Sequence, residues 1–281
     1  MSDFVTLQEA AQRLGVHYMT AYRYVRLGQL PAQKVGGTWR VAISDLDLFQ
    51  QPNASEPSPS LSRKSAPWHQ RLENRLLEGD LSGAWRVVEA SLTAGMAPLD
   101  VYCDVFVPAL DSIGHRWESG EIGVADEHLA SAMVARMIGR LGPRFTRRGR
   151  RRGAVVVAGP PGERHDLGLA MVADALRQGG YSAIEMGSDL PVESFAQGLG
   201  GLRGLKGVCI GVLNPEALGE CRHMVVEARR HLDRSAPVVL GGSAVRGPDH
   251  AHQLGADQWA DLRHVVEAVD TGREAQPAVW V

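Results

Sequence analysis

The residues with the clearest chemistry in this sequence are an acid and a histidine two positions apart, Glu163 and His165. They follow the apolar run at residues 154–158, which is typical of a buried parallel strand. Ligands of open α/β sheets bind at the carboxyl ends of such strands, so His165 is expected in a ligand site. One imidazole nitrogen can bind a metal while a carboxylate holds the other and fixes the tautomer. The pair is therefore a candidate metal-binding site.

A second group of chemically suited residues consists of Trp117 and the adjacent pair Glu127-His128. Helical periodicity places Trp117 near the end of one predicted helix and the pair in the first turn of the next, so a short loop brings them to one end of the two helices. Taken singly, Trp117 could belong to a core, and Glu127 could simply interact with the helix dipole. Together, a flat aromatic ring and two polar groups suit a large, partly apolar cofactor.

The stretch Glu163-Arg164-His165-Asp166-Leu167-Gly168 resembles the cobalamin-binding signature D-x-H-x-x-G, with Glu163 in place of the aspartate. The Trp-x9-Glu-His spacing resembles the helical cap of light-sensing cobalamin regulators of the CarH type. The resemblance implies that His165 is the lower axial ligand of cobalt and that Glu163 holds its imidazole. It also implies that Trp117 covers the upper face of the corrin beside an adenosyl group, with polar contacts from Glu127 and His128.

The same resemblance assigns several small residues to a slot for the nucleotide tail of the cofactor. Gly168 is expected to let the following helix approach closely, and Gly241-Gly242, just after a strand, to leave backbone space opposite. The family motif S-x-L or S-x-T falls at Gly211-Val212-Leu213, where this chain has no hydroxyl group. Asn214 or Ser243 could supply the missing hydrogen bond. Because the chain holds 32 glycines, these positions count only together with the histidine motif.

The chain departs from CarH-type regulators directly after Trp117. In those proteins the next residue is a histidine that ligates cobalt from above once light has removed the adenosyl group, whereas this chain has Glu118. A carboxylate is a harder ligand than imidazole, so we predict that illumination does not give a two-histidine product. His115 lies two residues before Trp117 and should face another side of the helix. Neither His115 nor His128 could substitute unless the helix end rearranges.

The first fifty residues predict a DNA-binding module. Thr6 can cap a helix at residues 7–14, a second helix is expected at 17–27, and two short strands at 31–35 and 38–43 are joined by Gly36-Gly37, which suits a tight hairpin turn. The pattern resembles the small winged helix-turn-helix of MerR-like regulators. The residues expected to contact DNA are His17, Tyr18, Thr20, Arg23 and Arg26 on the second helix, with Lys34 and Arg40 on the wing.

The charge of this module predicts that one copy binds DNA weakly. Residues 1–50 contain five lysines and arginines against four aspartates and glutamates. Oligomerisation would multiply the phosphate contacts, so promoter DNA and further copies of the chain are the expected partners. The alternative is a helix-turn-helix that has been reused for protein contacts. The arginine-rich run at residues 147–152 is interpreted as a solvated interdomain segment.

The rest of the chain divides into a linker and two domains. Residues 51–67 are rich in Pro and Ser and predict a linker. Residues 68–143 predict an antiparallel four-helix bundle, with helices at about 68–78, 81–94, 98–119 and 124–141. Residues 153–281 predict a flavodoxin-like, doubly wound parallel sheet, with strands at 154–158, 182–186, 207–213, 237–240 and 258–260. The predicted fold class is thus multidomain α and α/β.

Composition and motifs argue against several other classes of protein. The three cysteines are scattered, without the spacing of a zinc site or a disulfide framework. The sequence shows no signal segment and no apolar run of membrane-spanning length, which favours a cytoplasmic protein without membrane partners. It also lacks a G-x-S-x-G elbow, a Walker loop and a G-x-G-x-x-G motif after a strand, so enzymatic activity is not expected.

These expectations combine into one hypothesis, a cobalamin-dependent, light-responsive transcriptional regulator whose adenosylcobalamin-bound form controls oligomerisation and DNA binding. If it behaves like the CarH type, the dark form is a tetramer on promoter DNA. Methylcobalamin and hydroxocobalamin are the alternative cofactors. Two other functions stay open, a cobalamin sensor that ignores light and a corrinoid carrier for methyl transfer. A methyl carrier has no need of a helix-turn-helix, so the first fifty residues argue against it.

Overall fold

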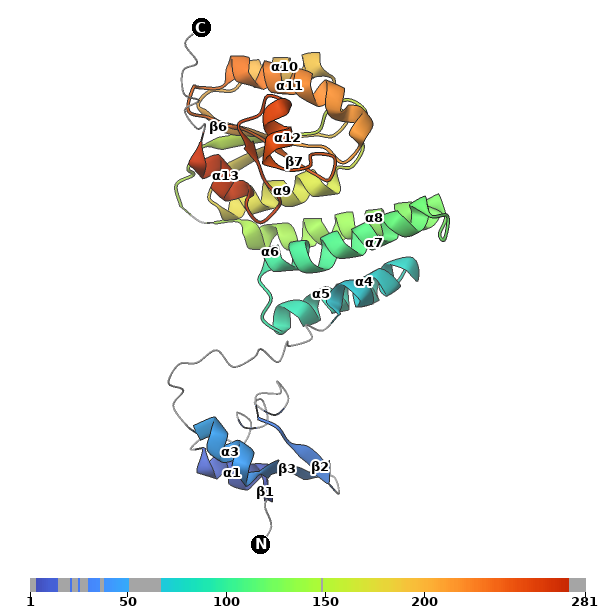
Figure 1. The fold of residues 1–281 in the computed structure, drawn as a ribbon, viewed down its shortest axis with the longest axis vertical. Coiled ribbons are helices and arrows are strands. Elements are labelled where there is room, and N and C mark those ends of the chain that lie inside the picture. Colours follow the sequence, from blue (N-terminus) through green and yellow to red (C-terminus); the bar gives the residue numbers. More distant parts are fainter. Residues whose placement is uncertain are drawn as a thin grey trace. The chain divides into compact units, whose positions relative to one another are not determined.

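The computed structural model describes residues 4–14, 21, 25, 30–35, 38–50, 67–147 and 149–272 (Figure 1). They fall into two compact units, Met1–Arg63 and Lys64–Val281. The first unit holds the sequence that predicts DNA binding, and the second holds both groups of candidate cofactor residues. Within the described part of the chain, no helix combines the length and the hydrophobicity needed to cross a membrane.

The N-terminal unit combines short helices with an antiparallel sheet. Its described elements are β1 (Phe4–Thr6), α1 (Leu7–Arg13), β2 (Gln33–Val35), β3 (Thr38–Ala42) and α3 (Ile43–Gln50), with the strands in the order β1-β3-β2. The predicted cap of α1 is confirmed. The Thr6 hydroxyl accepts a hydrogen bond from the Glu9 amide at 3.2 Å, and the Glu9 carboxylate accepts one from the Thr6 amide at 2.8 Å. The predicted hairpin is also present, as β2 and β3.

Two elements of this unit are absent from the sequence-based prediction. β1 pairs with β3, and α3 begins at Ile43, where the second predicted strand should still continue. A strand of three residues is too short for an alternating pattern to stand out in the sequence, and it exists here because β3 offers it an edge. Most of the predicted second helix, residues 17–27, lies outside the described residues.

The second unit begins with the predicted four-helix bundle. Its helices are α4 (Trp68–Leu77), α5 (Leu81–Thr93), a third helix, and α8 (Val124–Leu141). The third helix consists of α6 (Pro98–Val101), a π-helical turn (Tyr102–Phe106) and α7 (Val107–Glu118). Asp80 caps α5 by accepting a hydrogen bond from the Gly83 amide at 2.7 Å. α4 packs against α5, α7 and α8 around a core that includes Leu72, Phe106 and Met137.

A five-stranded parallel sheet forms the rest of the unit. Its strands are β4 (Ala154–Ala158), β5 (Ser182–Gly187), β6 (Leu205–Gly211), β7 (Val238–Gly241) and β8 (Gln258–Trp259), in the order β5-β4-β6-β7-β8. This order is the predicted flavodoxin-like one. Helices α9 (Leu167–Gln178) and α13 (Val265–Thr271) cover one face, whereas α10 (Val192–Gly200) and α11 (Leu218–His231) cover the other. α12 (Pro248–Gln253) packs beside β8.

One strand differs from its prediction in a way that affects the site. The strand expected at residues 207–213 runs from Leu205 to Gly211, so Val212 and Leu213 lie in the loop that follows it. Val212 is fully buried, which explains why its apolar character extends the strand pattern in the sequence. The shift places the backbone amide of Leu213 at the carboxyl edge of the sheet.

Hydrogen bonds and ion pairs fix the bundle on the sheet domain. The hydroxyl of Tyr102, a fully buried residue, donates to Asp174 Oδ2 in α9 at 2.8 Å. Burial raises the pKa of Tyr102, so the hydroxyl remains a hydrogen-bond donor. Arg263 donates to Asp100 and Asp104 at 2.6 Å each. These contacts hold the bundle against the face of the sheet that carries α9.

Candidate cofactor site

The loop after β4 places His165 next to Glu163. The Glu163 carboxylate is fully buried, and its Oε1 accepts hydrogen bonds from His165 Nδ1 at 2.5 Å and from the His165 amide at 2.9 Å. Its Oε2 accepts hydrogen bonds from the amides of Leu213 and Asn214 at 2.5 and 2.8 Å. Four donors therefore surround one carboxylate, and the imidazole is held through Nδ1.

These contacts determine the protonation of the pair. Burial alone would raise the pKa of Glu163, but hydrogen bonds from His165, Asn214 and Leu213 outweigh it and hold the pKa at about 2. An ionised carboxylate only accepts hydrogen bonds, so His165 Nδ1 must carry a proton. The same hydrogen bond raises the pKa of His165, which makes the ring more basic.

The second ring nitrogen of His165 is the free one. The side chain is 58% exposed, and Nε2 has no hydrogen-bond partner within the described residues. A metal-ligating histidine usually donates its other N–H to a carboxylate in this way. A single exposed nitrogen suits a metal already enclosed by a macrocycle, because such a metal needs only an axial ligand from the protein. The residues present therefore fit the cobalt of a corrinoid.

The other residues of the motif surround His165 without fixed contacts to it. Arg164 and Asp166 are exposed, and Asp166 precedes α9 without capping it through its side chain. Its charge contributes to the raised pKa of His165. A β-carbon at Gly168 would meet no atom within 4 Å, so no described atom packs closely against this glycine, and the close helix approach expected at the cofactor slot stays a prediction. Open space borders the first turn of α9.

The glycines at the ends of β6 and β7 bring neighbouring chain segments together. A β-carbon at Gly211 would lie 2.7 Å from Leu169 Cδ2, and one at Gly241 would lie 2.7 Å from the Ala260 carbonyl oxygen. Gly242 has a φ of +93°, and its β-carbon would lie 2.2 Å from a carbonyl oxygen of the loop after β6. Backbone of adjacent segments thus occupies the β-carbon positions of Gly241 and Gly242, and the space that these glycines are expected to leave for the nucleotide tail stays a prediction.

Asn214 and Ser243, the two candidates to replace the hydroxyl group missing at residues 211–213, lie in different surroundings. Asn214 is engaged locally, since its side chain accepts a hydrogen bond from the Glu216 amide and donates one to the Gly162 carbonyl oxygen, both at 3.1 Å. Ser243 is exposed in the loop after β7. The Ser243 hydroxyl is thus more available than the Asn214 amide for a hydrogen bond to a ligand.

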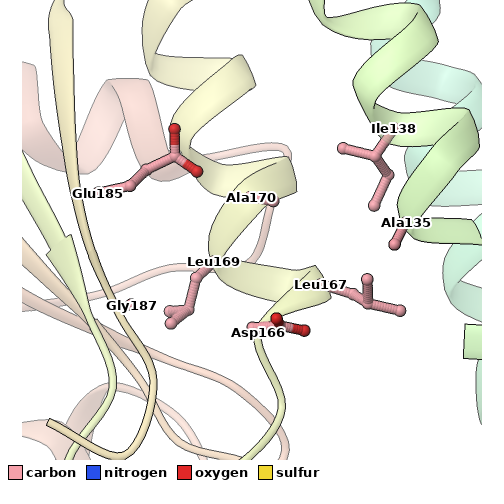
Figure 2. A pocket seen from close by; sticks show the side chains of 8 residues that line it. All are labelled: Ala135, Ile138, Asp166, Leu167, Leu169, Ala170, Glu185 and Gly187. Atoms are coloured by element: carbon pink, nitrogen blue, oxygen red, sulfur yellow. The ribbon is translucent and has the colours of Figure 1, made fainter. Parts of the chain in front are cut away.

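A pocket of about 230 Å³ lies between α8, the start of α9 and β5 (Figure 2). Its lining residues are Ala135, Ile138, Asp166, Leu167, Leu169, Ala170, Glu185 and Gly187. In Figure 2, Leu167 points towards Ala135 and Ile138 of the bundle. Pockets that enclose a drug-sized ligand measure about 300–1,000 Å³, so this one can take only the edge of a larger cofactor. It adjoins the His165 loop through Asp166.

The end of the bundle carries the second predicted group of residues. Trp117 lies near the end of α7 and is 45% exposed, so it is not a core residue. Glu127 and His128 lie near the start of α8. Glu127 accepts a hydrogen bond from the Ser131 hydroxyl at 2.7 Å, and the His128 side chain is exposed. The hydrogen bond to Glu163 is the main cause of the raised pKa of His165, and the charge of Glu127 acts in the same direction.

An ion-pair network that the sequence analysis did not identify holds this end of the bundle. Arg116, next to Trp117, donates to the Glu73 carboxylate at 2.9 Å and pairs with Glu121 at 2.7 Å. The Glu121 amide donates back to the Arg116 carbonyl oxygen at 2.9 Å. The network fixes the loop between α7 and α8. Its signal in the sequence is Glu73, an acid beside Leu72 on the apolar face of α4.

Glu118 and His115 are the residues near the end of α7 that the sequence analysis considered as ligands from above the cobalt. Glu118 is the exposed last residue of α7. His115 Nδ1 lies 2.6 Å from the Asp111 carbonyl oxygen of its own helix, which orients the ring locally. Glu118, which stands where CarH-type regulators have a histidine, therefore faces solvent directly after Trp117.

The predicted DNA-contacting residues are described only in part. Lys34 lies in β2, and Arg40 is an exposed residue of β3. The register pairs Gln33 with Arg40, so both candidate residues lie on the same hairpin. His17, Tyr18, Thr20, Arg23 and Arg26 lie outside the described residues.

Two family models match the chain. Residues 4–54 match the helix-turn-helix domain, and residues 68–141 match the B12 binding domain. Among individual proteins, the HTH-type transcriptional repressor CarH of Myxococcus xanthus is 33% identical over 168 residues, which cover 59% of this chain and 54% of that protein. The chain thus spans about half the length of this curated relative.

Corrinoid proteins match a longer part of the chain at lower identity. Monomethylamine corrinoid protein 2 of Methanosarcina acetivorans is 22% identical over 197 residues, which cover 68% of this chain and 90% of that protein. The structure of the Methanosarcina barkeri monomethylamine corrinoid protein aligns with a TM-score of 0.63 at 17% identity, covering 73% of this chain and 97% of that one. The predicted fold class and the resemblance to CarH-type regulators are confirmed by these matches.

Proposed function

We propose that this protein is a CarH-type transcriptional regulator that binds cobalamin through His165 and DNA through its helix-turn-helix domain. The observation that carries the proposal is the buried Glu163 carboxylate, which holds the His165 imidazole through Nδ1 and leaves Nε2 exposed. In this proposal residues 1–50 bind DNA, residues 68–143 form the helical cap of the cofactor, and residues 153–281 form the sheet domain that binds it. A bound adenosylcobalamin supplies a cobalt–carbon bond that light can break.

Each part of the site has a distinct task in this proposal. His165 would hold the cobalt of the cofactor through Nε2, and Glu163 keeps the ring in the Nδ1–H tautomer and raises its basicity. Trp117 would offer an aromatic surface to the cofactor, and Glu127 and His128 would offer polar groups beside it. The pocket at the start of α9 receives an edge of the macrocycle.

Regulation requires that the cofactor states differ in their affinity for DNA or for further copies of the chain. The DNA-binding unit has an excess of only one positive charge over residues 1–50, so a single copy binds weakly and several copies are needed on one promoter. The bundle end with Trp117 is the surface that senses the upper ligand. Adenosylcobalamin therefore favours oligomers that occupy DNA, and loss of the adenosyl group favours their dissociation.

The test of cofactor binding replaces, one at a time, two histidines that each lie beside a carboxylate. His165→Ala should change the visible spectrum of bound adenosylcobalamin and weaken its retention in gel filtration. His223→Ala is the matched control, because His223 is exposed and its Nδ1 lies 3.3 Å from Glu220. An unchanged spectrum in His165→Ala would remove His165 from the site.

The test of regulation follows oligomeric state and DNA binding together. Gel filtration and gel shift should move in parallel when adenosylcobalamin is added in the dark and again after green light. Tight DNA binding by the cofactor-free monomer would contradict the proposal. A response to the cofactor without a response to light would assign the protein to the light-independent sensors.

A methyl-carrying corrinoid protein is the second candidate, and the likeness to the Methanosarcina proteins favours it. Such a carrier presents its cobalt to separate enzymes, and the match of residues 4–54 to a helix-turn-helix domain argues against it. Transfer of a methyl group from the loaded protein to a thiol acceptor, without any cofactor effect on DNA binding, would decide for the carrier.

A further inference from the structure

Positive charge in the second unit is concentrated in one segment between α8 and β4. Residues 64–281 carry 24 lysines and arginines against 27 aspartates and glutamates, a formal charge of −3. Six of the arginines lie within residues 144–152, which contain no acidic residue, so the unit would carry −9 without them. Such a local excess of positive charge on an acidic background points to an anionic partner.

The fold holds this segment at both ends. At its start, Phe145 is buried in the bundle core. At its end, Arg152 donates to the two oxygens of Asp270 at 2.5 and 3.1 Å and lies 4.6 Å from the centre of the Tyr181 ring. Arg151 donates to the Tyr181 carbonyl oxygen at 3.2 Å. The segment is therefore anchored to the fold at Phe145 and at Arg151 and Arg152.

A pocket of about 220 Å³ lies within the segment. Its lining residues are Arg147, Gly149, Arg150, Arg151, Arg152, Gly179 and Gly180. Arg144, Arg147 and Arg150 are exposed, and among the described residues no hydrogen bond or ion pair engages their guanidinium groups. Guanidinium groups bind phosphate oxygens through paired, charge-assisted hydrogen bonds. The chemistry of the pocket thus matches a phosphate group.

This surface is separate from the candidate cofactor site. Arg152 lies before the amino end of β4, whereas His165 lies after its carboxyl end. The five residues of β4 span roughly 16 Å, so the two sites lie at opposite edges of the sheet. A cobalamin bound at His165 would therefore leave the arginines accessible.

We propose that Arg144, Arg147 and Arg150, supported by Arg151 and Arg152, form a second DNA contact that binds backbone phosphates of the duplex held by the helix-turn-helix domain. The proposal rests on the proposed function for its choice of partner. Guanidinium–phosphate contacts carry no base information, so this surface adds affinity without sequence preference. The chain from Gln50 to Pro67 can extend over at most roughly 60 Å, which lets both units reach one duplex.

The test measures how DNA binding depends on salt. The full chain, loaded with adenosylcobalamin in the dark, is titrated against a labelled duplex of mixed sequence at several salt concentrations. The slope of log K against log salt is negative, and each lost phosphate contact reduces its magnitude by about 0.9, so Arg144→Gln/Arg147→Gln/Arg150→Gln should reduce that magnitude by about 1 to 3. The matched control, Arg203→Gln/Arg234→Gln/Arg246→Gln, removes the same charge from three exposed loop positions and should leave the slope unchanged.

The possible results separate this inference from the proposed function. Equal slopes for the two triple variants would overturn the second contact. So would an arginine effect seen only on vesicles that contain phosphatidylglycerol, because it would assign the surface to a membrane. A wing variant, Lys34→Gln/Arg40→Gln, tests the helix-turn-helix independently. If that variant binds DNA as tightly as the unmodified chain, the proposed function fails whatever the arginine variants show.

Discussion

Replacing the Glu163 carboxylate by an amide should separate the stability of the protein from its ability to ligate a metal. In Glu163→Gln one oxygen becomes an NH2 group, which donates hydrogen bonds and accepts none. The carboxylate accepts two hydrogen bonds at each oxygen, from His165 at Oε1 and from the amides of Leu213 and Asn214 at Oε2. The amide can keep only one of these two sets.

The orientation of the new side-chain amide depends on which of the two sets of donors can rearrange to accept a hydrogen bond. An NH2 group facing Leu213 and Asn214 would leave two backbone amides without an acceptor. An NH2 group facing His165 leaves only the His165 amide without one, because the ring can switch to the Nε2–H tautomer and accept at Nδ1. The cost should therefore be that of one unsatisfied buried donor, about 1–3 kcal/mol of the free energy of unfolding. The switched tautomer has no lone pair at Nε2 for a metal.

Two measurements on the same preparation check this reasoning. Urea unfolding of the cofactor-free protein should show a loss of about 1–3 kcal/mol, and the affinity for adenosylcobalamin should fall by about 10–100-fold. Glu216→Gln is the matched control, because Glu216 is an exposed carboxylate two residues after Asn214. If Glu163→Gln binds the cofactor with the affinity and spectrum of the unmodified protein, the role assigned to the carboxylate is wrong.

Three further predictions address other parts of the structure. Tyr102→Phe removes the buried hydrogen bond to Asp174 and should lower the free energy of unfolding by about 1–3 kcal/mol in urea, and a change within 0.5 kcal/mol would contradict the role of this contact. Gly242→Ala should lower the melting temperature because its φ is +93° and a carbonyl oxygen blocks the β-carbon, whereas Gly168→Ala meets no atom and should leave stability equal or higher by about 1 kcal/mol. After illumination of the adenosylcobalamin complex, the unmodified protein should show no stable two-histidine spectrum and Glu118→His should show one, so such a spectrum in the unmodified protein would refute the argument from Glu118.

Sequence patterns predicted the bundle helices and the strands of the parallel sheet because local periodicity encodes them, whereas β1 and α3 of the N-terminal unit were missed. The four amphipathic segments of the bundle and the apolar runs of the sheet appear in the structure close to their predicted bounds, since each buries a continuous face. The position of His165 after β4 also follows from the chain, because the carboxyl end of a parallel strand is a fixed place in this fold. Boundaries were less reliable where buried loop residues such as Val212 continue an apolar run.

Long-range contacts were beyond the sequence because they depend on where distant segments meet. The Leu213 amide donates to Glu163, which lies fifty residues earlier in the chain. Because every residue except proline carries a backbone N–H, the residue type at this position could not predict the contact. The packing at Gly241 and Gly242 likewise depends on neighbouring loops, so a glycine in the sequence could equally have marked open space. The sequence thus determined which residues could hold a cofactor, and the tertiary structure decided which nitrogen of His165 is free to do so, because only the folded loops bring four donors to one buried carboxylate.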